Sequence, residues 1–570
     1  MNKIRVVLAI GVLGLPLAYL FSQERDEYQK WLKEQQRQFQ EFKDQRDKEF
    51  SEFLQKEWKE FQSFQGIKPF EKPKPTKIPV YKPESQRKPQ PEVRPQPEVK
   101  PQPEVRKEEP KPQPEPKPQP ESKPAAESQK EESPKPQPEA KPEPQPAPET
   151  RKEEAPKPKP ESMPAPESMP ETRKEEPPQP KPQPEARLKR SEEKAPEPMS
   201  SPGAALSSLT VDFFGAPVSV EHEKEFRPPR LGGKVSKESI SEFWVAMSKA
   251  PHEGLLAGLQ RQREERKLND WGFALLAYRT GKKIFQSTNE AVLFVWFVMT
   301  KSGYESRVGF RDNSVYLLLP SETVIYRTTY FTLDGKRYYA VKLEGDPDPL
   351  SGAIYSYDGK YPGAEKPISF AVKELPRLQS GTATKSLRFM FRGKEYDVQI
   401  QYSKDAVQFL EYYPQTGFEV YFESSPSSEA KSSLLNSLRP LVSGKNEVEA
   451  VNLVLRFVQT AFEYKTDPEQ FGREKPMFPD ETLYYPYSDC EDRSILFAYL
   501  VRNLLGLEVI GLDYPDHIAT AIRFTTDVPG DAVVHNGKRY VICDPTYINA
   551  DAGAAMPQYK NVSPNVIAIR

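Results

Sequence analysis

A proline-rich segment divides this chain of 570 residues and limits where a folded core can form. Most of the 62 prolines lie between Pro69 and Pro202, in repeats such as PQPEVR and KPQPE. The segment has few apolar side chains to offset the entropy lost on ordering, and proline removes backbone donors. We therefore expect residues 67–200 to form a disordered tether, and residues 200–570 to hold two or three modest domains with cores of their own.

Residues 1–22 have the pattern of an export signal. Two basic residues precede an apolar run from Val6 to Phe21, as in a secretory signal peptide or a short signal anchor. The run is shorter than the about 20 residues that a membrane-spanning helix needs. The pattern predicts an exported envelope protein, periplasmic or anchored to the inner membrane, and leaves cleavage open. The tether then reaches across a periplasm, like similar spacers in envelope-spanning bacterial proteins, or is a plain flexible linker.

Aromatic residues recur with a period of eleven between residues 28 and 64. Two series share this period: Tyr28, Phe39, Phe50 and Phe61, and Trp31, Phe42, Phe53 and Phe64. An eleven-residue repeat keeps such residues on one stripe of a helix and favours a straight or right-handed coiled coil. We expect residues 23–66 to form a coiled-coil helix that self-associates or docks a partner. The alternative is an amphipathic helix lying on the membrane.

The motif SDCED at residues 488–492 begins a predicted helix. Apolar residues recur at helical spacing after it, and Ser488 or Asp489 supplies an N-cap with an acid three residues later. Cys490 then lies in the first turn, where free N–H groups and the helix dipole favour a thiolate. The neighbouring acids oppose this effect, so the thiol needs a base.

Two strands that follow this helix carry a histidine and an aspartate. His517 opens a segment with period-2 alternation. Asn536-Gly537 indicates a type I′ hairpin, and Asp544 follows its second strand. Alternation directs Cys543 away from the face that carries Asp544, which argues against a disulfide to Cys490. A thiol, a histidine and an aspartate in this order predict a Cys-His-Asp triad; the alternative is three residues that never meet.

These motifs resemble those of the transglutaminase-like superfamily, in particular its bacterial cysteine-protease-like members. The resemblance covers about residues 446–550 and implies an α+β, papain-like domain at residues 441–570, with the cysteine helix packed on an antiparallel sheet. It implies that Cys490 is the nucleophile, His517 the general base and acid, and Asp544 the carboxylate that orients the histidine. Ile518-Ala519 stands where many members have an aromatic residue, which leaves the substrate class open.

Residues 201–345 contain a sequence pattern similar to that of the predicted catalytic domain. The range is predicted to be mainly helical up to residue 300 and to continue with strands. Aligned with small gaps, Ser287, Val315 and Lys342 fall near the positions of the three triad residues. We interpret this range as a degenerate copy of the catalytic unit, with chance similarity as the alternative. Between Ser386 and Phe422, apolar and polar residues alternate as in β-strands. This pattern predicts a small β domain at residues 346–440.

Other residues near Cys490 are candidates for supporting roles. Tyr485 and Tyr487 precede the nucleophile and either line a substrate groove and help the Cys490 backbone N–H bind an oxyanion, or are packing residues. The resemblance also implies a calcium site, since some relatives with DCED-like motifs depend on calcium. Its ligands would be Asp489, Glu491 and Asp492, which form an oxygen-rich cluster with Asp513 and Asp516. A solvated helix start without metal is the alternative.

The sequence as a whole predicts an exported cysteine hydrolase of peptides or proteins. The formal net charge of −1 gives no electrostatic indication of nucleic-acid binding. The competing hypothesis is a non-catalytic envelope scaffold that assembles through its N-terminal helix.

Overall fold

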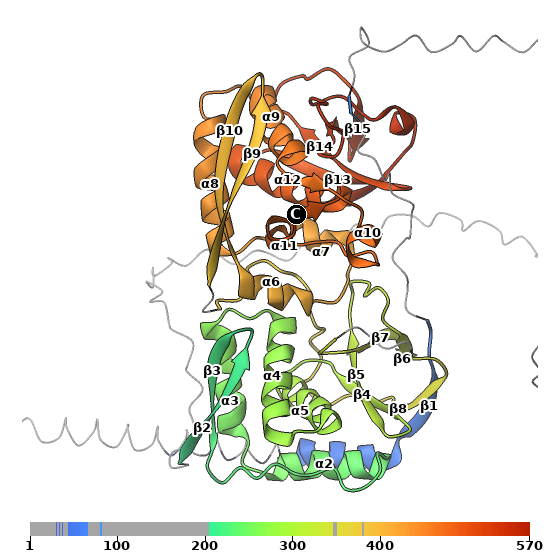
Figure 1. Ribbon diagram of the computed structural model, residues 1–570. Helices are drawn as coiled ribbons and strands as arrows, with labels where there is room; N and C mark the ends of the chain where they lie inside the picture. The colour runs from blue at the N-terminus through green and yellow to red at the C-terminus, as the bar shows by residue number, and fades with distance from the viewer. Residues whose placement is uncertain are drawn as a thin grey trace, which may run out of the picture. The chain divides into compact units, whose positions relative to one another are not determined.

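Two antiparallel sheets, each packed against a buried helix, form the framework of this mixed α+β structure (Figure 1). The computed structural model describes residues 44–65, 80–81, 205–345, 350–378 and 381–570, with Lys30, Glu34, Arg37 and Glu41. These residues belong to one compact unit of the chain. The predicted export signal, and the predicted tether apart from Val80 and Tyr81, lie outside the described residues. No helix in the described part of the chain has the length and apolar character needed to span a bilayer.

The first half begins with a hairpin and continues with helices and a sheet. The sequence predicted a mainly helical range up to residue 300, and it did not predict this hairpin, which precedes the helices. Its residues alternate between buried and exposed positions, which is the pattern of a strand. The elements in order are β2 (Leu206–Phe213), β3 (Ala216–Glu223), α2 (Lys237–Lys249), α3 (Glu253–Glu265), α4 (Asp270–Phe285), α5 (Thr288–Lys301), β4 (Arg307–Arg311), β5 (Ser314–Pro320), β6 (Tyr330–Leu333), β7 (Lys336–Val341) and β8 (Ala353–Tyr357).

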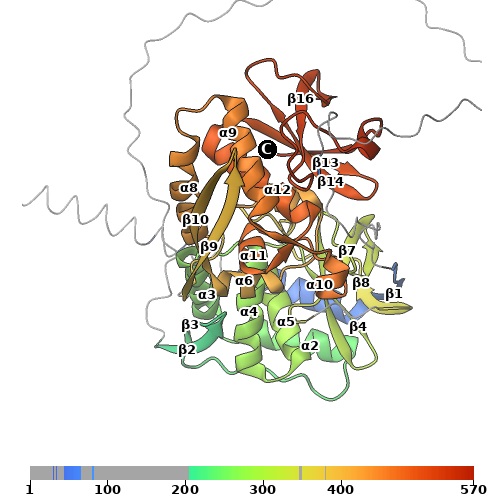
Figure 2. The ribbon, with the colours of Figure 1, turned by 45° about the horizontal axis from the view of Figure 1, so that its top comes forward.

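The second half also begins with a hairpin and ends with a five-stranded sheet (Figure 2). Its first elements are β9 (Thr382–Phe391), β10 (Lys394–Ser403), α6 (Lys404–Glu411), α7 (Phe418–Phe422), α8 (Ser428–Val442), α9 (Glu447–Thr460), β11 (Glu463–Tyr464), α10 (Asp467–Phe471), α11 (Pro479–Tyr484) and β12 (Tyr487–Ser488). The remaining elements are α12 (Cys490–Leu505), β13 (Glu508–Tyr514), β14 (His517–Arg523), β15 (Ala532–His535), β16 (Lys538–Cys543), the 3₁₀ turn η2 (Pro557–Tyr559) and β17 (Asn565–Ala568).

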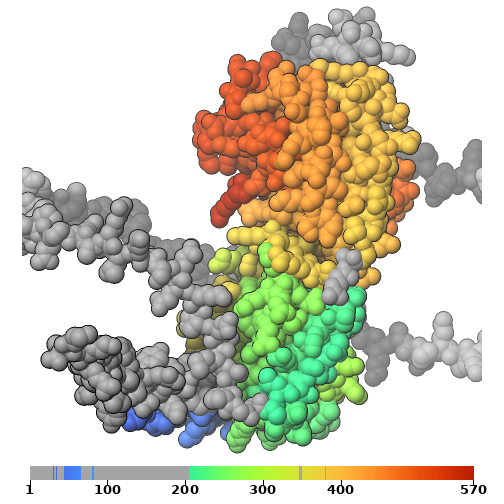
Figure 3. Space-filling view, turned by 90° about the vertical axis from the view of Figure 1, so that its left-hand side faces the viewer, coloured from blue at the N-terminus to red at the C-terminus, as the bar shows by residue number. Residues whose placement is uncertain are grey.

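The two halves share one topology. Apart from the edge strand β1 (Trp58–Gln62), the strand order of the first sheet is β8-β4-β5-β7-β6. The order of the second sheet is β17-β13-β14-β16-β15, and neighbouring strands are antiparallel in both. In each half a buried helix, α5 or α12, precedes the first strand and packs on the sheet. Two helices also pack on the hairpin of each half. In the first half α3 packs on β3 and α4 on β2, and in the second half α8 packs on β10 and α9 on β9. Figure 3 shows the yellow hairpin beside the orange helix α8.

Strand register identifies the residues of the first half that occupy the triad positions. His517 opens β14 opposite Tyr514, and Ser314 opens β5 opposite Arg311. Asp544 follows the last residue of β16, as Lys342 follows the last residue of β7. The first residue of α5 is Thr288, where α12 has its cysteine. The first half therefore has no cysteine, histidine or aspartate at these three positions. The sequence alignment placed Ser287 and Val315 where the structure places Thr288 and Ser314, and it placed Lys342 correctly.

The predicted small β domain at residues 346–440 is confirmed only for its first two strands, which form the hairpin β9–β10. Residues 407–413 and 417–422 were expected to be strands, but they fall mainly in the helices α6 and α7. Ser403 caps α6, because its hydroxyl accepts a hydrogen bond from the Ala406 N–H at 3.1 Å. A short apolar run in a sequence fits a helix or a strand equally well. Here the Ser403 cap and the packing of the segment favour the helix α6.

The N-terminal aromatic segment packs on its own chain, and the predicted coiled coil over residues 23–66 is not confirmed. Residues 44–56 are helical, but β1 (Trp58–Gln62) pairs with β8 as an edge strand. Phe50 is buried, and its ring centroid lies 4.8 Å from that of Trp244. Asp47 pairs with Lys301 of α5 at 2.5 Å. Phe50 therefore packs inside this chain, and the blue helix lies beside the green helix α2 (Figure 1).

Replacing Phe50 with alanine tests this packing. We expect Phe50→Ala to lower the free energy of unfolding by about 3–5 kcal/mol, because it leaves a cavity in the core. The control is Phe64→Ala, since Phe64 belongs to the same repeat but is 47% exposed. Chemical denaturation measures both values. Equal and small effects, together with a loss of oligomers in Phe50→Ala, would instead support a coiled coil.

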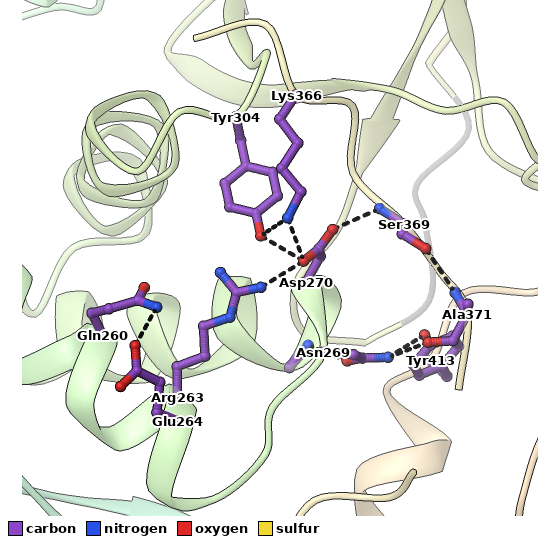
Figure 4. A network of polar contacts seen from close by, with 11 residues as sticks. Gln260, Arg263, Glu264, Asn269, Asp270, Tyr304, Lys366, Ser369, Ala371 and Tyr413 are labelled. Atoms are coloured by element: carbon purple, nitrogen blue, oxygen red, sulfur yellow. Dashed lines mark hydrogen bonds and ion pairs between the residues drawn. The ribbon is translucent and has the colours of Figure 1, made fainter. Parts of the chain in front are cut away.

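A buried carboxylate joins the first half to the segment that leads into the second (Figure 4). Asp270, in the first turn of α4, is surrounded by Arg263 at 2.7 Å, the Tyr304 hydroxyl at 2.5 Å, the Ser369 N–H at 3.0 Å and Lys366 at 3.3 Å. The neighbouring Asn269 donates to the Ala371 carbonyl at 3.0 Å and to the Tyr413 hydroxyl at 2.8 Å. Because Tyr413 follows α6, this network connects the helices of the first half to the second.

A second buried carboxylate, Asp480 in α11, makes stability depend on pH. It accepts hydrogen bonds from the backbone N–H of Ser427 at 2.8 Å and from the Ser427 hydroxyl at 2.5 Å. Burial raises the pKa of Asp480 to about 6. Between the unfolded pKa of about 3.9 and this value the folded state binds more protons than the unfolded state. The contribution of protonated Asp480 to stability is thus complete below about pH 4 and is lost as pH rises through 6.

Asp480→Asn removes this titration. The unmodified protein loses stability between pH 4 and pH 7 as Asp480 ionises, and the variant does not. We therefore expect the difference in free energy of unfolding, variant minus unmodified protein, to increase by roughly 3 kcal/mol from pH 4 to pH 7. The measurement is chemical denaturation at both pH values, and Glu395→Gln, at an exposed position of β10, is the control. A difference that is the same at both pH values would show that Asp480 ionises normally.

Candidate active site

Helix α12 positions the predicted nucleophile. Asp489 is its N-cap, and the Asp489 N–H donates to Asp492 Oδ2 at 3.1 Å, so the predicted acid-capped helix start is present. Cys490 is the first residue of the helix and is fully buried. Its Sγ lies 3.2 Å from Glu491 Oε2. The hydroxyl of Ser494, one turn further on, donates to the Ile518 carbonyl at 3.0 Å and fixes the helix against β14.

The structure brings the predicted histidine and aspartate together. His517 Nε2 lies 2.8 Å from Asp544 Oδ2, and both side chains are buried. The other carboxylate oxygen, Asp544 Oδ1, accepts the backbone N–H groups of Thr546 at 2.9 Å and Tyr547 at 3.2 Å. These bonds hold the carboxylate in place, and its oxygen beside Nε2 favours the tautomer with hydrogen on that nitrogen.

The second ring nitrogen of His517 is therefore the basic one. Nδ1 is buried and has no hydrogen-bond partner among the residues that the structure describes. Buried polar atoms without a partner are rare and costly, and they occur at functional sites. A neutral imidazole with hydrogen on Nε2 keeps its lone pair on Nδ1, where it can accept a proton from a thiol.

Tyr559 packs beside the histidine. Its ring is stacked on His517, with ring centroids 5.2 Å apart and an interplanar angle of 9°. Its hydroxyl donates to Asp516 Oδ1 at 2.8 Å. The pKa of Tyr559 is raised by burial, by Asp516 and, to a smaller extent, by the charge of Cys490. The Tyr559 ring therefore covers one face of the His517 imidazole.

Sequence reasoning missed Gln459, which holds the loop after Asp544. Its Nε2 lies 3.1, 2.8 and 3.0 Å from the carbonyl oxygens of Asp544, Tyr547 and Ala550. It is buried in α9, seven residues after Asn452, whose side chain accepts the Ala552 N–H at 2.8 Å. Two buried polar residues seven apart on an apolar helix lie on one face, and this spacing was the available signal.

Five acids lie close together around the start of α12. Ligand atoms of Asp467, Asp489 and Asp492 lie within 4.8 Å of one another, and so do those of Asp467, Glu474 and Glu491. The predicted calcium ligands are therefore joined by Asp467 and Glu474, which come from another segment. Ionised carboxylates this close repel one another unless protons or a cation intervene. The oxygen donors suit a hard cation such as calcium, which those residues would hold.

Arg493 supplies a fixed positive charge beside these acids. It is fully buried, and its guanidinium donates to the Phe462 carbonyl at 2.8 Å and to the Gln459 carbonyl at 3.2 Å. Burial lowers the pKa of Arg493 to about 10, against the raising effect of Tyr464 and the nearby acids. The arginine therefore stabilises the negative charge at the start of the helix.

The two tyrosines predicted to bind substrate or an oxyanion have other contacts. The Tyr485 hydroxyl donates to Glu411 Oε1 at 2.9 Å. Tyr487 lies in β12, and Lys465 Nζ is 5.1 Å from its ring centroid. These contacts fit the packing interpretation of both tyrosines.

The second cysteine is separate from the site. Both cysteines are free, as strand alternation predicted. Cys543 is fully buried, and burial raises the pKa of its thiol well above the ordinary value. A thiol reagent at neutral pH is therefore expected to spare Cys543.

Comparisons of the chain with protein-family models, curated proteins and solved structures give no match.

Gln459→Leu tests the support of the Asp544 loop. The substitution removes the donor to three carbonyls, and we expect a loss of about 1–3 kcal/mol in unfolding free energy. We also expect faster hydrogen exchange at the Thr546 and Tyr547 amides, which bond to Asp544. Gln399→Leu, at an exposed position of β10, is the matched control. Unchanged exchange at both amides would mean that Gln459 does not hold this loop.

Proposed function

We propose that this protein is an exported, envelope-associated cysteine hydrolase of the transglutaminase-like class, which cleaves amide bonds in peptides or proteins. The observation that carries the proposal is the buried pair of His517 and Asp544, with Nδ1 of the histidine left as the base. The position of Cys490 at a helix N-terminus supports it, because such positions favour a thiolate. Its export depends on the N-terminal sequence pattern alone.

The reaction begins with proton transfer from the Cys490 thiol to His517 Nδ1. Asp544 stabilises the resulting imidazolium through its bond to Nε2. The thiolate attacks the amide carbonyl, and backbone N–H groups at the start of α12 stabilise the oxyanion that forms. His517 then gives its proton to the leaving amine, and the carbon–nitrogen bond breaks to leave a thioester on Cys490. His517 next takes a proton from water, which attacks the thioester and releases the acid and the thiol.

A calcium ion at the acidic cluster fits this proposal. Asp467, Asp489 and Asp492 would hold it, and it would neutralise charge that otherwise disfavours a thiolate at Cys490.

A non-catalytic binding protein is the second candidate. The observation that favours it is the complete burial of Cys490, since a buried thiol is often inert.

The reactivity of Cys490 separates the two candidates. In the Cys543→Ala background, we expect iodoacetamide to alkylate Cys490 at pH 7 at least tenfold faster than an ordinary thiol of pKa about 8.5. His517→Ala should remove this advantage, and Asp544→Asn should reduce it, because the imidazole loses its partner. Mass spectrometry after timed quenching gives the rates. An ordinary rate that neither substitution changes would favour the binding protein.

A further inference from the structure

Val80 and Tyr81, near the beginning of the predicted tether, pair with the loop that follows Asp544. Val80 forms a parallel β-bridge with Ile548, and the Tyr81 N–H donates to the Ile548 carbonyl at 2.7 Å. The ring of Tyr81 meets that of Tyr547 edge-on, with centroids 5.6 Å apart and an interplanar angle of 82°. The contact combines a main-chain hydrogen bond with an aromatic side chain, which is how peptide-binding edges hold extended ligands.

The edge that receives this segment is fixed to the catalytic aspartate. Tyr547 is buried, its N–H bonds to Asp544 Oδ1, and its carbonyl accepts Gln459 Nε2 at 2.8 Å. The Asn549 N–H donates to Gln459 Oε1 at 3.2 Å, so the residue after Ile548 is held as well. The edge is therefore formed before any ligand arrives, which lowers the entropic cost of binding.

The aromatic surface under Tyr81 continues to the histidine. Tyr547 belongs to one hydrophobic cluster with Tyr514 and Tyr559, and Tyr81 packs against this cluster. Tyr559 is the residue whose ring is stacked on His517. A polypeptide that lies on this edge is thus in contact with the group of side chains that surrounds the proposed base.

We propose that Tyr547 and Ile548 form a subsite for an extended polypeptide with an aromatic residue, and that Val80–Tyr81 of the same chain occupy it as a resident ligand. The Ile548 carbonyl provides the main-chain hydrogen bond, and Tyr547 selects the aromatic side chain. As a statement about substrates, this inference rests on the proposed function. It specifies the substrate class as unfolded or extended polypeptide and makes the tether a competitor for it.

The resident ligand is held weakly enough to be displaced. Val80 keeps 50% of its surface exposed. The described contacts of the pair are the bridge to Ile548 with its hydrogen bond, and the packing of Tyr81 on Tyr547 and its cluster. Its advantage is covalent attachment, which gives it a high effective concentration at the subsite. A free peptide therefore competes poorly until the resident side chains are removed.

The test measures binding of a fluorescent peptide TKIPVYKP, the sequence of residues 76–83, to the full chain carrying Cys490→Ala. We expect Val80→Asp combined with Tyr81→Ala to tighten binding at least tenfold relative to the chain without these changes. Val93→Asp, in the PEVR repeats, is the matched control and should change nothing. The peptide TKIPVAKP should not bind. Equal binding to all three proteins, or equal binding of both peptides, would overturn the subsite.

Hydrolysis is measured separately with Cys490 present, so that the two proposals can fail independently. Selective binding without cleavage would support the subsite and count against the hydrolase. Cleavage of peptides with no effect of the Val80 and Tyr81 substitutions on binding would support the hydrolase and overturn the subsite, since the segment would then be only an anchor for the tether.

Discussion

The hydrogen bond between His517 and Asp544 is the interaction on which the candidate site depends. It determines which ring nitrogen is the base, and it exists only because β14 and β16 are neighbours in the sheet. The carboxylate is held by two backbone N–H groups, and Gln459 holds the loop that supplies one of them. The orientation of the His517 ring therefore depends on groups beyond the three predicted residues of the triad.

The shared topology of the two halves shows what the fold requires and what the chemistry adds. The first sheet has the same strand order with Ser314 and Lys342 at the positions of the histidine and the aspartate. A helix on an antiparallel sheet is therefore stable without a triad. This agreement supports the interpretation of the first half as a degenerate copy. Its networks around Asp270 and its contacts to Phe50 serve packing.

The sequence predicted the elements whose signals are local. The start of α12, the strand at His517 and the hairpin at Asn536-Gly537 each follow from spacing within about ten residues, and all three are present. Residues brought together by tertiary structure were missed, such as Asp467 in the acidic cluster and Gln459. The aromatic repeat was misread because a stripe shows that a partner surface exists, but not that the same chain provides it.

The ultraviolet absorbance of the thiolate near 240 nm tests the central claim most directly. The difference spectrum between the Cys543→Ala protein and the same protein with Cys490→Ser, followed as a function of pH, reports the ionisation of Cys490 alone. A thiolate that persists well below pH 8.5, and that disappears in His517→Ala, is the result expected for a Cys490–His517 ion pair. A thiolate that appears only near the ordinary thiol pKa, with or without His517, would contradict it.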